Sequence, residues 1–177
     1  MHANGGYGHS VAGERAPTPA VAALIRGGID HRLHRYNHDP GSGPFGAEAA
    51  KAMMSVVGAD AARVHKTLVV DADGRLAVVV VPVTTELDLR AAAAALGARR
   101  AALAPPAVAQ RVTGYVVGGI SPLGQKRRLP TLIDAEAQSW PTIFVSGGQR
   151  GLEIELAAGD LAQCTTGQFV PLARKPH

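Results

Sequence analysis

The sequence predicts a single α+β domain whose sheet is mostly antiparallel. Of its 177 residues, 46% are hydrophobic and only 18% are charged, which is enough apolar material for one packed core. Predicted strands and helices are mixed along the chain without the regular strand–helix–strand spacing of a doubly wound parallel fold. No internal repeat or linker divides the chain. The polar, Gly-rich start, Met1–Ala16, is predicted to be a disordered extension and not a secretory signal.

The predicted elements follow from capping residues, turn residues and hydrophobic patterning. Thr18 is a favourable N-cap and Pro19 a favourable first residue for the first helix. Asp71-Ala-Asp-Gly74 is typical of a hairpin turn between two apolar strands. The predicted helices are Pro19–Arg26, Ala47–Val57, Leu87–Leu96, Pro105–Val112 and Ala158–Cys164. The predicted strands are Ile29–Tyr36, Arg63–Val70, Arg75–Val83, Leu132–Asp134, Thr142–Ser146, Leu152–Leu156 and Phe169–Leu172, and Gly114–Pro130 is predicted to be irregular.

The composition narrows the classes of function. A single cysteine, Cys164, excludes an internal disulfide and a Cys/His zinc quartet, and it favours the cell interior. Cys164 follows an apolar helical stretch without a basic neighbour, so we interpret it as a bystander and not a nucleophile. No apolar run approaches the roughly 20 residues that span a bilayer. The net charge of +4 and pI of about 9.6 favour a partner that carries phosphates.

One lysine stands out in a chain that has no P-loop, Rossmann fingerprint, nucleophile elbow or zinc-protease signature. Lys66 lies at the head of the apolar strand segment Leu68–Val70. A buried ammonium is costly unless it has a partner or a ligand. The alternative is a lysine whose stem lies on the sheet rim and whose charge reaches water.

Two Gly-rich stretches offer a candidate pocket. In Thr113–Pro130, Gly118 and Gly119 allow backbone N–H groups to approach a ligand oxygen, and Lys126, Arg127 and Arg128 add a basic patch. The alternative for this stretch is a turn beside a solvated basic face. Ser146–Gly151 is a second Gly-rich loop after an apolar strand, and the two loops together are candidates to line one cleft. Its alternative is a simple strand connection.

Acidic and histidine residues add weaker candidates. Glu153 and Glu155 share one face of their strand, where Glu153 is placed to accept an amine; the alternative is a polar sheet face. His31, His34 and His38 are interpreted as solvent-facing residues of an edge strand and not as metal ligands. His34 shares a face with Tyr36, toward a candidate pocket.

Three segments resemble the YbaK/EbsC family. They are V-H-K-T-L-V-V (64–70), T-G-Y-V-V-G-G-I-S-P-L-G-Q-K-R-R-L-P-T-L-I-D (113–134) and I-F-V-S-G-G-Q-R-G-L-E-I-E-L-A-A-G-D-L (143–161). The resemblance covers residues 18–174 as one domain and leaves 1–17 as the extension. It implies a sheet curled into a partial barrel with surrounding helices, similar to the editing domain inserted in bacterial prolyl-tRNA synthetases.

The resemblance also implies an activity: hydrolysis in trans of cysteine mischarged onto tRNA(Pro). The implied partners are the aminoacyl-tRNA and prolyl-tRNA synthetase, in the cytoplasm, with no cofactor, metal or membrane. Lys66 matches the family's essential lysine, and Gly118 and Gly119 would polarise the ester carbonyl. The implied substrate-binding residues are Tyr36, Phe45, Thr67, Ile120, Ser121, Pro122, Ser146, Gly147 and Glu153, and the implied tRNA-binding residues are Lys126, Arg127 and Arg128.

Two departures from the family pattern concern the site. Glu153 stands where the family has an aspartate, and the region between Phe45 and Lys66 is slightly long, so the second helix is expected to be shifted.

The chain offers no convincing nucleophile or general base of its own, and the family resolves this by substrate assistance. The substrate's cysteine thiol attacks its own ester, a step in which orientation supplies much of the rate. Three alternatives stay open: an editing deacylase for alanine or another amino acid, a non-catalytic module that binds tRNA or the synthetase, and a hydrolase for small esters or thioesters.

Overall fold

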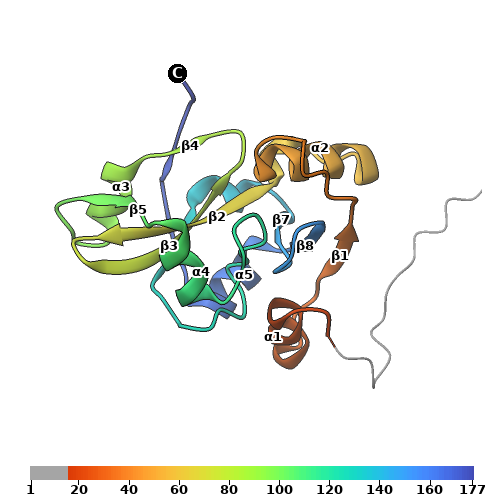
Figure 1. Ribbon diagram of the computed structural model, residues 1–177, viewed down its shortest axis with the longest axis horizontal. Coiled ribbons are helices and arrows are strands. Elements are labelled where there is room, and N and C mark those ends of the chain that lie inside the picture. Colours follow the sequence, from red (N-terminus) through yellow and green to blue (C-terminus); the bar gives the residue numbers. More distant parts are fainter. Residues whose placement is uncertain (1–15) are drawn as a thin grey trace, which may run out of the picture.

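The computed structural model describes residues 16–177, so the predicted extension over residues 1–17 lies almost wholly outside the described residues. The described chain is an α+β domain in which three sheets are packed among five α-helices, as the sequence predicted. In Figure 1, α2 and β1 lie at one side of the molecule, and α3 with β5 lies at the other. No helix within residues 16–177 has the length and apolar character to cross a bilayer.

The largest sheet has five strands in the order β5-β2-β3-β6-β9. Its centre is the hairpin of β2 (His65–Ala72) and β3 (Arg75–Pro82), with β5 (Ala101–Leu103) antiparallel to β2. On the other side, β6 (Thr131–Asp134) and β9 (Gln168–Val170) run parallel to β3. The hairpin turn is shorter than the predicted four residues. Asp73 and Gly74 both have positive φ, as a two-residue type I′ turn requires, and this lets Asp71 and Ala72 continue the strand.

A three-stranded antiparallel sheet, in the order β1-β8-β7, carries much of the site described below. It consists of β1 (Arg32–Arg35), β7 (Ile143–Ser146) and β8 (Leu152–Leu156). A single parallel bridge between Val64 and Phe144 joins it to β2 of the large sheet. The third sheet pairs β4 (Glu86–Leu87) with β10 (Ala173–Arg174). Within residues 16–177 these sheets do not close into a barrel.

The helices begin and end close to the predicted capping residues. They are α1 (Pro19–Gly27), α2 (Phe45–Val57), α3 (Leu89–Ala95), α4 (Pro106–Thr113) and α5 (Ala158–Thr165), with 3₁₀ turns η1 (Ala61–Arg63) and η2 (Ala135–Ser139). Thr18 caps α1 by accepting from the Val21 N–H. Helix α2 ends at Val57, as predicted, and begins two residues earlier than predicted, at Phe45.

Three clusters of buried side chains form the core. The largest joins α1, α4 and α5 to one face of the three-stranded sheet and to the large sheet, through residues such as Leu24, Ile133 and Ile154. A second cluster lies between the other face of the large sheet and α3. The third is small: Ala49, Ala50 and Met53 of α2 pack against Val64 and Phe144. Helix α2 therefore covers the second face of the three-stranded sheet.

Candidate functional site

The two Gly-rich loops meet at the start of α2. Gly118 has φ +88°, and a Cβ built there would lie 2.7 Å from three ring carbons of Phe45. Gly119 is packed against the second loop, because a Cβ there would lie 2.9 Å from the Cα of Gln149. Only residues without a side chain permit both approaches. The two Gly-rich loops therefore lie against each other, and the first of them also contacts the start of α2.

The backbone donors of these loops are not equally available. The Gly119 N–H donates to the Val116 carbonyl at 2.9 Å, and the Gly147 N–H donates to the Leu152 carbonyl at 2.8 Å. The Gly147 carbonyl in turn accepts from the Thr18 hydroxyl at 2.6 Å. Among the described residues, the Gly118 N–H has no such acceptor, so it is the better placed of the predicted glycines to bind a ligand oxygen.

Ile120, Ser121 and Pro122, predicted to contact substrate, are buried beneath the loop. Ser121 is fully buried, and its hydroxyl accepts from the Leu123 N–H at 3.2 Å. Ile120 belongs to the large core cluster. These residues support the loop from below, which leaves Gly118 as its half-exposed part.

Arg150 ties the loops to α2. Its guanidinium carbon lies 4.7 Å from the ring centroid of Phe45. Its Nε and Nη2 both donate to the Val117 carbonyl, at 3.1 Å and 2.8 Å. The ring of Phe45 also lies near His38, with 5.6 Å between ring centroids. Phe45 is thus held between parts of the chain that are distant in sequence.

Glu153 is the buried acid of the site. On β8 it pairs with Ser146 of β7 and with His34 of β1, so these three side chains lie on the face that α2 covers. Glu153 is 5% exposed, and its Oε2 has no hydrogen-bond partner among the described residues. Burial raises the pKa of this carboxyl to about 8. A cationic group that enters here could donate a hydrogen bond to the unpaired Oε2 of Glu153.

Tyr36 lies beside this acid. Burial, reinforced by the negative charges of Glu153 and Glu48, raises the pKa of the Tyr36 phenol to about 12. Its backbone N–H donates to the Gly151 carbonyl at 2.9 Å, which attaches the end of β1 to the second Gly-rich loop. Tyr36 also packs against the small cluster under α2. The structure therefore brings Tyr36, Phe45, Ser146 and Glu153 to the region around α2.

Glu155, two residues along the same face, is a structural acid. It accepts from the Thr142 hydroxyl at 2.7 Å and pairs with Arg63 at 3.2 Å and His34 at 2.8 Å. Burial opposes its ionisation, but the hydrogen bonds and the two basic neighbours hold its pKa below the usual range. One strand thus carries two glutamates with opposite environments.

The histidines are less exposed than predicted. His34 lies on the edge strand β1, as expected, but its side chain is only 13% exposed and packs edge-on against Phe144. His38 pairs with Glu48 at 2.8 Å. The acidic partners explain the difference, because each lies on another element and is not apparent from the local pattern. His31 precedes β1 and is held by the Ile29 carbonyl.

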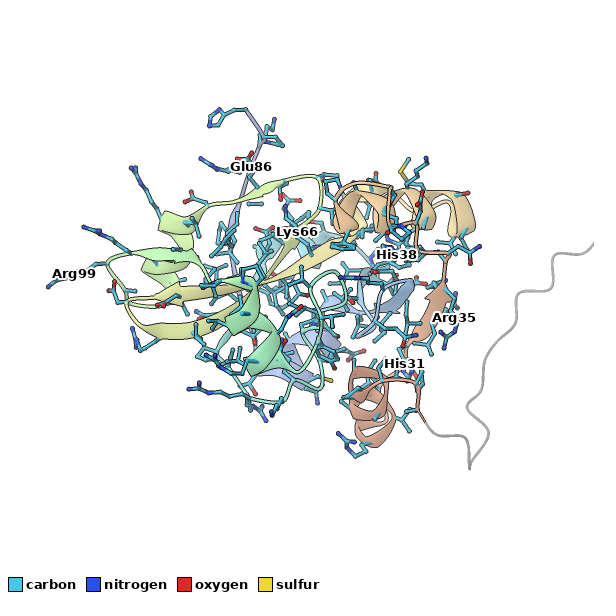
Figure 2. All side chains as sticks on the ribbon, in the orientation of Figure 1. His31, Arg35, His38, Lys66, Glu86 and Arg99 are labelled. Atoms are coloured by element: carbon cyan, nitrogen blue, oxygen red, sulfur yellow. The ribbon has the colours of Figure 1, made fainter. Side chains whose placement is uncertain are left out.

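Lys66 is half-buried on β2, and its Nζ donates to the Thr85 carbonyl at 2.8 Å. Burial lowers the pKa of this amine, and nearby Glu86 opposes the shift. Figure 2 shows Lys66 on the side of the molecule that carries Glu86 and α2. Val64 of one strand and Phe144 of the other form a parallel bridge. Lys66 and Ser146 each lie two residues after their bridge residue, so they lie on the same face as the bridged pair. This relation places Lys66 beside the three-stranded sheet.

Thr67 does not share the position of Lys66. Neighbouring residues on a strand point to opposite faces, and Thr67 is paired with Val80, which belongs to the large core cluster. Its hydroxyl is buried without a partner among the described residues. Thr67 therefore faces the core side of the sheet.

Lys126, Arg127 and Arg128 form an exposed basic segment. The backbone N–H groups of Lys126 and Arg127 donate to carbonyls at the end of α4, at 2.9 Å and 3.0 Å. Arg128 donates through Nη2 to the Thr166 hydroxyl. The backbone of the segment is fixed, and its charges face solvent.

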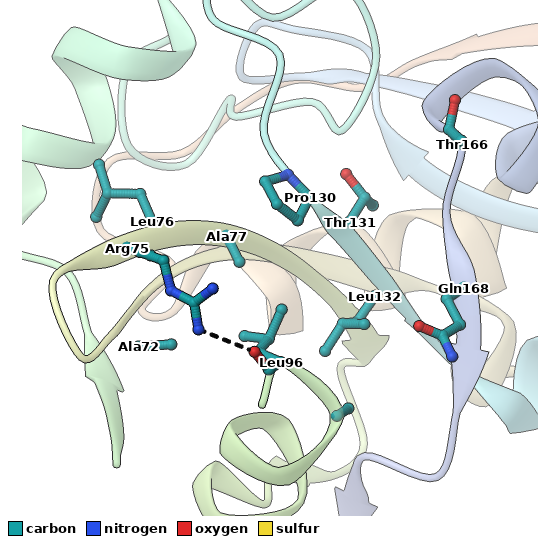
Figure 3. Close-up of a pocket in the computed structure, with 11 residues that line it drawn as sticks. Ala72, Arg75, Leu76, Ala77, Leu96, Pro130, Thr131, Leu132, Thr166 and Gln168 are labelled. Carbon is teal, nitrogen blue, oxygen red and sulfur yellow. Dashed lines mark hydrogen bonds between the residues drawn. The ribbon is translucent and has the colours of Figure 1, made fainter. Parts of the chain in front are cut away.

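A cavity of about 300 Å³ lies elsewhere, at the hairpin end of β2 and β3 (Figure 3). Its lining includes Arg75, Leu96, Leu132 and Gln168, and the Arg75 guanidinium donates to the Leu96 carbonyl at 3.1 Å. Lys66 stands at the opposite end of β2, and none of the predicted site residues lines this cavity. Cys164 is half-buried on α5 and packs against the large core cluster, and burial and Asp160 raise the pKa of its thiol.

The sequence reasoning missed two contributors. Arg150 lies inside the second Gly-rich loop, Ser146–Gly151, and a charged side chain among the glycines of that loop is the signal that could have identified it. Thr85 contributes only a carbonyl, which no side-chain motif reveals.

Comparisons with known proteins identify the family of the chain. Residues 46–164 match the family described as the aminoacyl-tRNA editing domain. A curated relative from Enterococcus faecalis, named as the Cys-tRNA(Pro)/Cys-tRNA(Cys) deacylase EbsC, is 37% identical over 128 residues, which cover 72% of this chain and 78% of the relative.

Two solved structures show the same fold. A protein described as a trans-editing enzyme for prolyl-tRNA synthetase is 23% identical, with a TM-score of 0.75 over 91% of this chain and 99% of that one. The hypothetical protein APE2540 is 21% identical, with a TM-score of 0.77 over 89% of this chain and 100% of that one. By its sequence match across most of the described domain, this chain belongs to the aminoacyl-tRNA editing domain family.

Proposed function

We propose that this protein is a trans-acting deacylase that removes cysteine from mischarged Cys-tRNA(Pro). The observation that carries the proposal is Glu153: a buried carboxyl with a free oxygen, opposite Ser146 on the sheet face that α2 covers. Such a carboxyl suits the α-ammonium of an esterified amino acid. The 37% identity to a relative named as a Cys-tRNA deacylase supports the choice of cysteine.

The proposed reaction is assisted by the substrate. The cysteine sulfur attacks the ester carbonyl carbon, a C–S bond forms, and the bond to the ribose oxygen breaks. The thiol proton ends on the departing ribose hydroxyl, and water later opens the released thiolactone. Fixing the thiol against its own ester supplies rate through orientation, with effective molarities of about 10⁵ M or more for well-aligned groups.

In this scheme the residues of the protein bind the substrate and polarise its ester carbonyl. The Gly118 N–H is the donor for the developing oxyanion, and Glu153 takes the ammonium. Lys66 holds the terminal ribose or phosphate by exchanging its bond to the Thr85 carbonyl for one to the substrate. Ser146 needs no nucleophilic role, and its hydroxyl accepts from the Gly148 N–H at 3.3 Å. No side chain of the protein forms a covalent intermediate in this scheme.

The tRNA body is proposed to lie along Lys126, Arg127 and Arg128. Phosphate contacts fix orientation but do not read sequence. We therefore propose prolyl-tRNA synthetase as the cytoplasmic partner that delivers the correct tRNA.

The first test is deacylation of Cys-tRNA(Pro), Ala-tRNA(Pro) and Ser-tRNA by the wild type, Lys66→Ala and Lys51→Ala. Lys51 is an exposed lysine on α2 and serves as the matched control. We expect rapid cysteine release by the wild type and by Lys51→Ala, and none by Lys66→Ala. A preference for alanine would replace the substrate in this proposal, and no release from any substrate would leave only a binding role. Trapping an acyl group on Ser146 or Cys164 would refute substrate assistance.

A further inference from the structure

Arg150 connects three segments that are distant in sequence. It belongs to the loop between β7 and β8, it stacks over Phe45 at the start of α2, and it donates two hydrogen bonds to the Val117 carbonyl next to Gly118. The backbone of the same loop is in close approach to Gly119. One guanidinium therefore contacts both Phe45 and the carbonyl next to Gly118, in addition to the direct contact between Phe45 and Gly118.

The same guanidinium keeps unused donors. Of its five N–H groups, Nε and Nη2 supply the two that donate to Val117, and the other three have no acceptor among residues 16–177. Arg150 is exposed and forms no ion pair with an acid of the described chain. A guanidinium that is oriented by stacking and retains free donors is suited to bind a phosphate through two parallel hydrogen bonds.

We infer that Arg150 binds a backbone phosphate at the 3′ end of the RNA substrate and transmits that contact to Gly118 through Phe45 and Val117. This inference rests on the proposed function, because it takes the aminoacyl ester to lie at Gly118. The phosphodiester that links the terminal nucleotide to its neighbour is then one ribose away from the ester. Binding the phosphate orders the guanidinium, and the ordered guanidinium fixes the oxyanion-binding backbone.

Two substitutions separate the two parts of this role. Arg150→Gln removes the charge, whereas Arg150→Lys keeps the charge and loses the planar stacking group with its paired donors. Arg26→Gln is the control, since Arg26 is an exposed arginine in the last turn of α1, at the opposite end of that helix from Thr18, which contacts Gly147. Thermal melting establishes that each variant is folded before it is compared.

The binding measurement is the dissociation constant for uncharged tRNA over a series of KCl concentrations. Arg150→Gln should lower the slope of log K against log salt by about 0.7, the value for one phosphate contact on a single strand, while Arg150→Lys should keep the wild-type slope. An unchanged slope in Arg150→Gln would overturn the phosphate contact. This measurement needs no turnover, so it stands even where the deacylase proposal fails.

The kinetic measurement is single-turnover deacylation of Cys-tRNA(Pro) at saturating enzyme. Arg150→Lys should bind tRNA nearly as well as the wild type but release cysteine about tenfold more slowly, because Gly118 is no longer held in place. Arg26→Gln should match the wild type in both assays. If the wild type deacylates and Arg150→Lys deacylates equally fast, the coupling to Gly118 is refuted while the proposed function survives.

Discussion

Replacing Glu153 by glutamine should make the protein's stability less dependent on pH. Burial raises the pKa of Glu153 from 4.5 to about 8, so the folded state holds a proton that the unfolded state releases. The stability that this proton contributes is complete below pH 4.5 and is lost as the pH rises through 8. Linkage converts the difference in pKa into a total loss of about 5 kcal/mol, of which about 3 kcal/mol is lost by pH 7.

The assay is urea unfolding of the wild type and Glu153→Gln at pH 5, 7 and 9. The glutamine amide is neutral at every pH. The free energy of unfolding of Glu153→Gln should therefore rise relative to that of the wild type from pH 5 to pH 9. Glu155→Gln is a control with the opposite sign, because the pKa of Glu155 is lowered by its partners. Glu155→Gln should be less stable than the wild type at pH 5, 7 and 9, and an added measurement at pH 3 should show the difference in stability narrowing, since the lowered pKa lies below 4.5. A wild-type minus Glu153→Gln difference that is flat with pH would refute the assignment of a buried, unpaired carboxyl.

Three further substitutions test other features. Gly118→Ala should reduce deacylation strongly, because its Cβ would overlap Phe45 and φ is +88°, and Phe45→Ala in the same chain should restore part of the rate if the overlap is the cause. Asp134→Ala should lower the free energy of unfolding in urea by about 3 kcal/mol. The Asp134 carboxylate is 2% exposed and accepts from the backbone N–H groups of Leu172 and Ala173, both at 2.8 Å. A decrease below about 1 kcal/mol would contradict this reasoning. Lys126→Ala should lower the salt slope of tRNA binding by about one phosphate contact, and an unchanged slope would remove Lys126 from the tRNA path.

The elements that the sequence predicted well depend on local signals. Thr18 caps α1 as expected, and β8 has the predicted limits because apolar and polar residues alternate along it. The strands that were missed, β4, β5 and β10, have two or three residues each and exist through their pairing partners. β5, for example, pairs only with the end of β2. Such pairing is a long-range property that local patterning does not encode.

The candidate site also combines residues that local signals reveal with contacts that depend on the whole fold. The residue pattern pointed to Lys66, Gly118 and Glu153, the family resemblance gave each an expected role, and the structure adds what surrounds each of them. The stacking of Phe45 on Gly118 joins residues 73 positions apart, and no spacing rule predicts it. The orientation of Thr67 was predictable, because a residue next to Lys66 on a strand must face the opposite side.

Helix α2 is the least firmly anchored wall of the site. It buries only Ala49, Ala50 and Met53, whereas Met54 and Val56, on its other side, remain more than half exposed. Segments with few buried contacts open locally at a free energy well below that of global unfolding. We therefore expect local opening of α2 to expose the Glu153 carboxyl to water and solutes, while the β2–β3 hairpin and the large core stay intact. The helix that conceals the acid thereby sets how often the acid exchanges its proton with solvent.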